Sequence, residues 1–131
     1  MSGSTAHWIA CRGRPLQGAL RVPGDKSVSH RAIMLGALAQ GTTRITGFLE
    51  GEDTRATAHV FEQLGVRIET PNASERVVHG VGLHGLRGSA SPLDCGNAGT
   101  GMRLLAGVLA GHRELGRPWD PAILRERVAA D

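Results

Sequence analysis

The stretch that decides the fold is residues 25–48, DKSVSHRAIMLGALAQGTTRITGF. Within Ser27–Ala39, apolar residues recur at intervals of three and four, which is the spacing of one helix face. Asp25 or Ser27 can cap this helix at its start. The β-rich run Thr42–Phe48 follows a glycine and predicts a short strand. The expected apolar face of the helix consists of Val28, Ala32, Leu35 and Leu38 or Ala39.

The same reasoning places the other elements outward from this stretch. The sequence predicts a strand at Gln17–Val22, a helix from Asp53 or Thr54 to Leu64, strands at Val66–Thr70, Arg76–His79 and Leu93–Cys95, and a helix at Met102–Leu109. This order is a βαβαββ unit followed by the start of another, and alternating elements indicate the α/β class. The mixed-charge tail 112–131 is expected to be solvated, with a possible short helix at Ala122–Ala130.

Composition narrows the classes of function. The chain has 131 residues, 40% of them hydrophobic and 21% charged, as expected for one globular domain. No apolar run reaches the length of a membrane span, and the amino terminus has no secretion-signal pattern. The two cysteines, Cys11 and Cys95, form no CxxC pair, so we expect neither a disulfide framework nor a zinc site, and a reducing cytoplasm fits.

Charge and glycine content favour small anionic ligands. Fifteen basic and twelve acidic residues give a formal net charge of +3, a mild preference for anionic partners. Aromatic residues make up only 3%, with no tyrosine, which argues against a single-stranded nucleic-acid binder. The 19 glycines allow the backbone to approach small anions closely, although most glycines serve ordinary turns.

The first motif that could carry chemistry is Pro23–Arg31, PGDKSVSHR. A helix start offers free N–H groups and a positive dipole end to phosphate or carboxylate. Lys26 adds a charge and Ser27 a hydroxyl, and Arg31 shares a helical face with Ser27. The alternative is a turn lysine, a capping serine and a surface arginine, and spacing alone does not decide. The motif is not a Walker A loop, because Asp25 precedes the lysine.

The second motif is Asp94–Arg103, DCGNAGTGMR. Its closely spaced glycines precede a helix and bring the backbone near a ligand, while Asn97 and Thr100 supply side-chain donors. The alternative is a tight strand-to-helix turn. A third glycine pattern, Gly80–Gly85, matches G-x-G-x-x-G, but no helix can open after it, so a dinucleotide site is rejected.

Other polar residues carry weaker signals. The six histidines are scattered without metal-ligand spacing, and each is expected to be structural. Glu50, Glu52 and Asp53 form an acidic cluster that a helix N-cap at Asp53 would largely explain. Cys95 is expected to be a buried, inert thiol.

The two motifs together resemble the two amino-terminal signatures of the enolpyruvylshikimate-phosphate synthase family. Glu52–Arg55, followed by a helix ending at Leu64–Val66, resembles the stretch between them, and the likeness covers about residues 8 to 111. The sister family that transfers enolpyruvyl to a UDP-sugar fits less well, because it has Lys-Asn where this chain has Lys26 and Ser27.

The resemblance implies a function and a site. The family transfers the carboxyvinyl group of phosphoenolpyruvate to the 5-hydroxyl of shikimate 3-phosphate, in aromatic amino-acid biosynthesis, without metal or organic cofactor. Lys26 matches a lysine that contacts both substrates, and Ser27 and Arg31 match ligands of shikimate 3-phosphate. The phosphoenolpyruvate loop is matched by Asn97, Gly99 and Thr100.

The resemblance also implies an architecture. The family fold, an inside-out α/β barrel, has two globules of three βαβαββ units each, with the active site in the cleft between them. We expect residues 1–22 to be strands of the far globule, 23–111 a partial near globule, and 112–131 a divergent tail. The family's acid/base carboxylates lie further downstream, so we expect an incomplete chain, truncated or frame-shifted, that is inactive alone and self-associates through uncovered apolar surface. A non-catalytic anion-binding fragment is the alternative.

Overall fold

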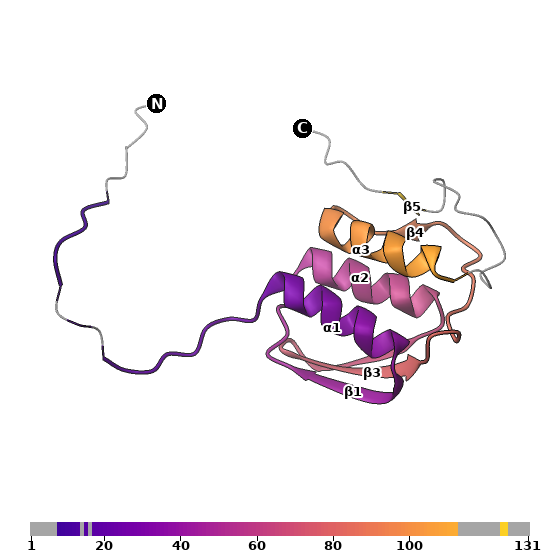
Figure 1. Cartoon of the computed structure of the whole chain (residues 1–131), viewed down its shortest axis with the longest axis horizontal. Helices are drawn as coiled ribbons and strands as arrows, with labels where there is room; N and C mark the ends of the chain where they lie inside the picture. Colours follow the sequence, from indigo (N-terminus) through magenta and orange to yellow (C-terminus); the bar gives the residue numbers. More distant parts are fainter. Residues whose placement is uncertain (1–7, 14, 16, 113–123, 126–131) are drawn as a thin grey trace, which may run out of the picture.

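The computed structural model describes residues 8–13, 15, 17–112 and 124–125. Helices and strands follow one another along the chain and build layers stacked on one sheet (Figure 1). The elements are α1 (Lys26–Leu38), β1 (Gln40–Thr46), α2 (Glu52–Gln63), β2 (Arg67–Asn72), β3 (Glu75–Val81), β4 (Leu93–Asp94), α3 (Gly99–Ala110) and β5 (Leu124–Arg125). The predicted α/β class is therefore confirmed.

The main sheet has three strands in the order β1-β3-β2, and both pairings are antiparallel. β1 aligns with β3 from Gln40 opposite Val81 to Thr46 opposite Glu75. The β2–β3 register shifts between Glu69 and Asn72, beside the turn that joins these strands. A hairpin and a helical connection thus place the longest strands side by side, as a compact α/β unit requires.

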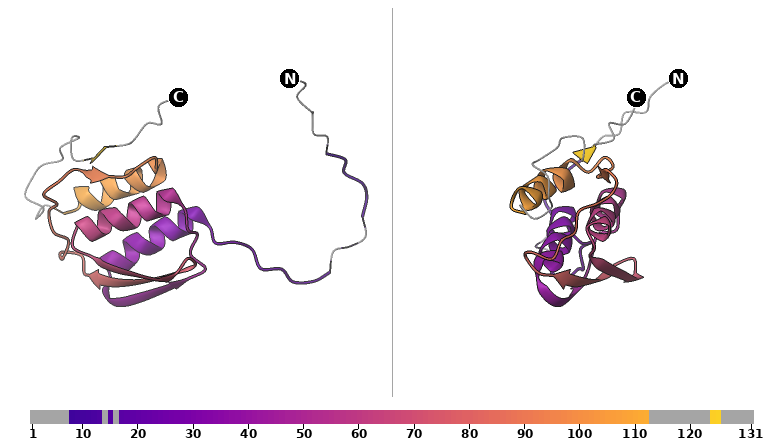
Figure 2. Two further views of the ribbon diagram at one scale, coloured as in Figure 1. Left: turned by 180° about the vertical axis from the view of Figure 1, so that it is seen from behind. Right: turned by 90° about the vertical axis from the view of Figure 1, so that its right-hand side faces the viewer.

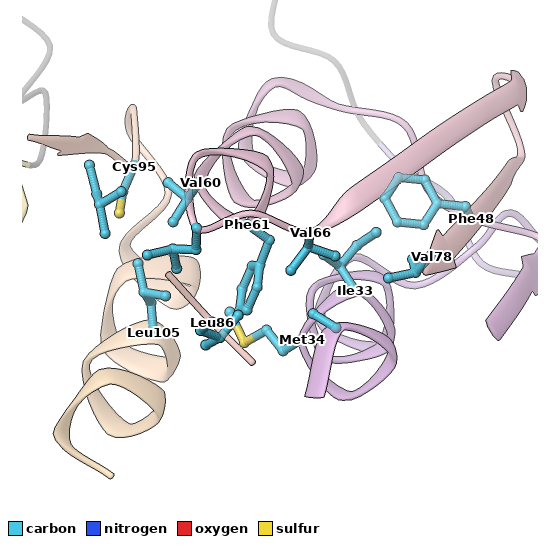
Figure 3. Packing of buried hydrophobic residues seen from close by; sticks show 13 residues of the cluster. Ile33, Met34, Phe48, Val60, Phe61, Val66, Val78, Leu86, Cys95 and Leu105 are labelled. Atoms are coloured by element: carbon cyan, nitrogen blue, oxygen red, sulfur yellow. The ribbon is translucent and has the colours of Figure 1, made fainter. Parts of the chain in front are cut away.

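One face of the sheet carries the helices. α1 packs on β1 and β3, and α2 packs on β2, while α3 lies across α1 and α2 on the side away from the sheet. Figure 2 shows this stacking end-on, with α3 as the outermost layer. The core fills the space between these layers, as Figure 3 shows with Ile33, Met34, Phe61, Val78 and Leu105 among its buried side chains.

The predicted apolar face of α1 is wrong. Val28 and Leu35 are 64% and 68% exposed, whereas Ile33 and Ala37 are completely buried. α1 is apolar on nearly all sides, so its periodicity does not determine which side meets the sheet. The contact at Gly36 determines that side. A Cβ at Gly36 would lie 3.3 Å from the Cβ of Val78, so the side of α1 that carries this glycine approaches β3 most closely.

A second glycine, Gly80 of β3, allows the same close approach of α1 to the sheet. A Cβ at Gly80 of β3 would overlap the carbonyl oxygens of Gly36 and Ala39 in α1 and just after it. Backbone therefore packs directly on backbone where α1 crosses β3, and a side chain at this position would separate the layers.

The two ends of the chain differ from the predictions. Gln17–Val22 forms no strand; Leu20 and Val22 are exposed, and the described residues offer no neighbouring strand to pair with them. A strand without a partner leaves its backbone groups unpaired, so local β pattern alone does not suffice. Within the helix expected at Ala122–Ala130, Leu124–Arg125 instead pairs in parallel with Leu93–Asp94; the rest of that helix lies outside the described residues.

The remaining predicted elements are confirmed, with shifted ends. α2 begins at Glu52, with Gly51 rather than Asp53 at the N-cap position, and it buries Val60 and Phe61. α3 begins at Gly99, three residues before the predicted start, because its glycines accept helical geometry as readily as a turn. In the part of the chain that the structure describes, no helix is long and apolar enough to cross a membrane.

Gly80→Ala is expected to lower the free energy of unfolding by about 2 kcal/mol, because the added methyl overlaps backbone oxygens that cannot rotate away. Urea denaturation of the 131-residue chain measures the change. The matched control is Gly107→Ala in the middle of α3, where nothing lies within 4 Å of the new Cβ. That control should raise stability by about 0.5–1 kcal/mol, because alanine favours helix over glycine. Equal stabilities of the two variants would contradict the close approach of α1 to β3.

Candidate functional site

The amino-terminal ends of α1, α2 and α3 lie at one end of the molecule (Figures 1 and 2). An ion pair between Lys26 and Asp53 joins the first turns of α1 and α2. α3 joins them one turn further in, where a Cβ at Gly101 would lie 2.6 Å from Oγ1 of Thr57 and 3.5 Å from Cε1 of His30. Three helix dipoles therefore direct their positive ends toward the same region.

The first motif forms the start of α1, as predicted. Asp25 is the N-cap, and its Oδ1 accepts a hydrogen bond of 2.7 Å from the amide of Val28. Lys26, Ser27 and Arg31 are exposed. Nη1 of Arg31 donates to the carbonyl of Ser27 at 3.0 Å, which confirms that the two residues share one helical face. This group, Lys26, Ser27 and Arg31, is called the α1 cradle below.

The second motif forms the start of α3. Gly96 turns the chain at a φ of +57°, and its amide donates to Oδ1 of Asp94 at 2.8 Å. Ala98 is the N-cap of α3 and makes no side-chain capping hydrogen bond. The first-turn amides of α3 are therefore directed toward the common end without a side-chain cap. Asn97, Gly99 and Thr100 are called the α3 cradle below; Asn97 and Thr100 are exposed and Gly99 is half-buried.

All six predicted site residues thus lie at one end of the molecule, distributed over two cradles. Such an end combines a lysine, an arginine, hydroxyl and amide donors and helix-start N–H groups. These are the donors that bind phosphate and carboxylate groups. Among the described residues, no three side chains of histidine, cysteine, aspartate or glutamate gather as ligands of a metal ion would.

Sequence reasoning missed the histidine beneath the cradles. His30 is completely buried, and its Nδ1 shares a hydrogen bond of 2.8 Å with Oγ1 of Thr57. Burial lowers the pKa of His30, and nearby Lys26 and Arg31 lower it further, while Asp53 acts in the opposite direction. The residue pattern offered one weak signal, the position of His30 between Ser27 and Arg31.

The acidic cluster has a different role from the one predicted. Asp53 is not the N-cap of α2 but the ion-pair partner of Lys26. Glu50 pairs with Arg76, whose side chain is only 3% exposed, and Oε1 of Glu50 lies 3.6 Å from Nε of Arg55. These carboxylates neutralise cations and fix the loop before α2.

Arg76 holds that loop against the sheet. Its guanidinium lies 4.4 Å from the ring centre of Phe48, and its Nη1 donates to the carbonyls of Asn72 and Glu75 at 3.0 and 2.7 Å. Burial lowers the pKa of Arg76. The remaining candidates stay outside the site: Gly80–Gly85 covers the end of β3 and the following turn, and Cys95 is buried as expected.

Comparisons with known proteins agree with this geometry. Residues 11–119 match the family described as EPSP synthase (3-phosphoshikimate 1-carboxyvinyltransferase). The chain is 73% identical over 113 residues to the 3-phosphoshikimate 1-carboxyvinyltransferase of Xanthomonas campestris pv. campestris strain B100, and 69% identical to that of Xanthomonas euvesicatoria pv. vesicatoria. Each alignment covers 86% of this chain and 26% of the relative.

A solved structure gives the same result. The EPSP synthase of Acinetobacter baumannii superimposes with a TM-score of 0.67 at 60% identity, over 71% of this chain and 21% of that protein. The chain therefore spans about a quarter of the length of the relatives it matches. Its helices and strands are part of the inside-out α/β fold of those enzymes. On the family match, the sequence identity and the shared fold, this chain belongs to the EPSP synthase family.

Proposed function

We propose that this chain supplies part of the substrate site for carboxyvinyl transfer from phosphoenolpyruvate to the 5-hydroxyl of shikimate 3-phosphate. The observation that carries the proposal is the shared location of the α1 and α3 cradles at the end where three helices begin. Both substrates are phosphorylated carboxylates, so two neighbouring groups of cations and N–H donors suit them chemically.

In this proposal the α1 cradle binds shikimate 3-phosphate and the α3 cradle binds phosphoenolpyruvate, and Lys26 is shared between them. Lys26 contacts both substrates, and Ser27 and Arg31 bind shikimate 3-phosphate. Asn97, Gly99 and Thr100 bind phosphoenolpyruvate, with the uncapped first turn of α3 adding backbone N–H donors. The ion pair with Asp53 holds the ammonium of Lys26 near the α2 start, from which it can turn to a bound anion.

The chemistry proceeds by addition and elimination. The hydroxyl loses its proton as its oxygen attacks the enol carbon, and a proton adds to the methylene carbon. The tetrahedral adduct then loses phosphate and a proton from its methyl group to give the product. Lys26 and Arg31 stabilise negative charge as it shifts during these steps. No carboxylate of the described residues is assigned as the acid or base, since Asp53 and Glu50 are already paired with cations.

The ends of the chain and its location complete the proposal. Residues 1–22 belong to the far globule of the family architecture, 23–111 to the near globule, and 112–131 diverge from it. The protein acts in the cytoplasm and needs no metal or cofactor. In the alternative function, a non-catalytic anion-binding fragment, the same cradles would bind phosphate compounds without discrimination.

Lys26→Ala is expected to weaken binding of shikimate 3-phosphate to the 131-residue chain by about tenfold or more, because a charge-assisted contact is lost. Titrations followed by NMR chemical shifts measure the affinity. The matched control is Arg67→Ala: Arg67 is an exposed cation that pairs with Glu69 near the carboxyl end of α2, away from the cradles. The control should bind as tightly as the parent chain.

The same titration, repeated with different anions, distinguishes the transferase site from the non-catalytic anion-binding fragment. Preference for shikimate 3-phosphate and phosphoenolpyruvate over inorganic phosphate supports the transferase site. Equal affinity for all three anions supports the anion-binding fragment, and equal losses in the Lys26 and Arg67 variants contradict both. A steep salt dependence with DNA fragments would instead point to nucleic acid.

A coupled phosphate-release assay on the 131-residue chain with both substrates is expected to show no turnover above background. The physical reason is that no acid or base is assigned among the described residues: Asp53 and Glu50 are paired with cations, and Asp25 accepts a hydrogen bond as the cap of α1. Release at a rate typical of enzymes, on the order of 10 per second, would overturn this part of the proposal.

We also propose that the chain self-associates through the outer face of α1. Val28 and Leu35 lie two turns apart on this helix and are both mostly exposed. Leu35→Lys should therefore lower the apparent mass at high concentration in sedimentation velocity. The control is Ile9→Lys, at an exposed isoleucine in the segment that precedes α1. A concentration-independent monomer would contradict the proposal.

A further inference from the structure

His30 is a buried imidazole with one nitrogen engaged. Its Nδ1 shares a hydrogen bond with Oγ1 of Thr57, and within the described part of the chain its Nε2 is buried with no hydrogen-bond partner. A buried polar atom without a partner costs free energy, so such a group is unusual in a core that needs only packing. The proposed function above gives this residue no task.

The position of His30 is between the two cradles. In α1 it directly precedes Arg31 and follows Ser27 by three residues, so one turn of helix joins it to the α1 cradle. Its Cε1 lies 3.5 Å from the Cβ position at Gly101, the residue after Thr100 of the α3 cradle. The ring and its partner Thr57 therefore lie where the second turns of α1 and α2 meet the first turn of α3.

Gly101 makes this arrangement possible. A Cβ at that position would lie 2.6 Å from Oγ1 of Thr57, closer than side chains tolerate. The first turn of α3 thus rests directly on the hydroxyl that bonds to His30. The hydroxyl of Thr57 therefore contacts both the ring of His30 in α1 and the first turn of α3.

We propose that His30 and Thr57 are positioning residues that set the separation of the α1 and α3 cradles, with Gly101 admitting the contact. The inference rests on the proposed function, because separation of the cradles matters only if both bind substrate. A neutral imidazole suits this role, since a proton would add positive charge beside three helix starts, Lys26 and Arg31. Burial of His30 and the resulting lower pKa keep the ring neutral at pH 7.

A matched pair of variants isolates the hydroxyl. Thr57→Val keeps the branched shape and removes the hydroxyl, whereas Thr57→Ser keeps the hydroxyl. Residual dipolar couplings of backbone N–H groups, measured on the 131-residue chain, report the orientation of α3 relative to α1. We expect Thr57→Val to change this relative orientation and Thr57→Ser to retain it. An unchanged orientation in Thr57→Val, or an equal change in both variants, would overturn the proposal.

A second pair tests the contact from the other side. Gly101→Ala should alter the relative orientation of α3 and α1, and Gly107→Ala, the same change where nothing lies within 4 Å, should not. Phosphoenolpyruvate affinity should fall by about tenfold in Gly101→Ala and Thr57→Val, and should remain unchanged in Gly107→Ala and Thr57→Ser. A mere loss of stability would shift the melting temperature without this pattern, and identical orientations in the Gly101 and Gly107 variants would overturn the proposal.

The couplings require no ligand, so the two proposals fail separately. A parent chain that binds neither substrate refutes the proposed function while leaving the orientation result in force. A parent chain that binds both substrates, with α3 unmoved in Thr57→Val and Gly101→Ala, refutes the positioning role alone.

Discussion

Three helices that begin side by side impose the main electrostatic constraint on this molecule. Their partial positive ends repel one another, and negative groups at the helix starts offset that repulsion. α1 has Asp25 as its N-cap, and α2 has Glu52 and Asp53 in its first turn. α3 has neither an acidic residue in its first turn nor a side-chain cap. An anionic ligand at this end would complete the balance.

A series of side-chain interactions connects the cradles at the helix starts to the sheet. Arg76 of β3 lies on the ring of Phe48 and pairs with Glu50, which fixes the loop leading to α2. That loop places Asp53 beside Lys26, so the cation of the α1 cradle is held by an interaction whose support begins in the core. Removing the guanidinium from such a buried pair is costly, because the carboxylate left behind loses its partner.

Much of this arrangement was predictable from local sequence. Asp25 as a cap, the close relation of Ser27 and Arg31, and the α/β order all follow from spacing and turn chemistry. The face of α1 did not, because that helix is apolar on opposite sides and only the contact of Gly36 with Val78 selects one. Equally, the strand expected at Gln17–Val22 depends on a partner strand, which no local pattern can supply.

In the candidate site, too, local patterns could be predicted from the sequence, whereas contacts between distant segments could not. The placement of the six cradle residues at two helix starts could be predicted from their chemical types and order along the chain, and their role in binding stays a prediction. His30, Thr57 and Gly101 could not be predicted, because their relation exists only across three helices that are far apart in sequence. The role of Asp53 was likewise misjudged, since an aspartate at a helix start suits a cap as well as an ion pair.

The backbone at Gly24 has a consequence for whatever is built on the amino-terminal segment. A Cβ at this residue would overlap the carbonyl oxygen of Gly47, so the chain is pressed against the loop before α2 as it enters α1. The backbone contact between Gly24 and Gly47 lies at the same end of the molecule as both cradles (Figure 1), and it fixes the path of the chain into α1. Because this contact is fixed, the residues before Gly24 must leave the molecule at the end where both cradles lie.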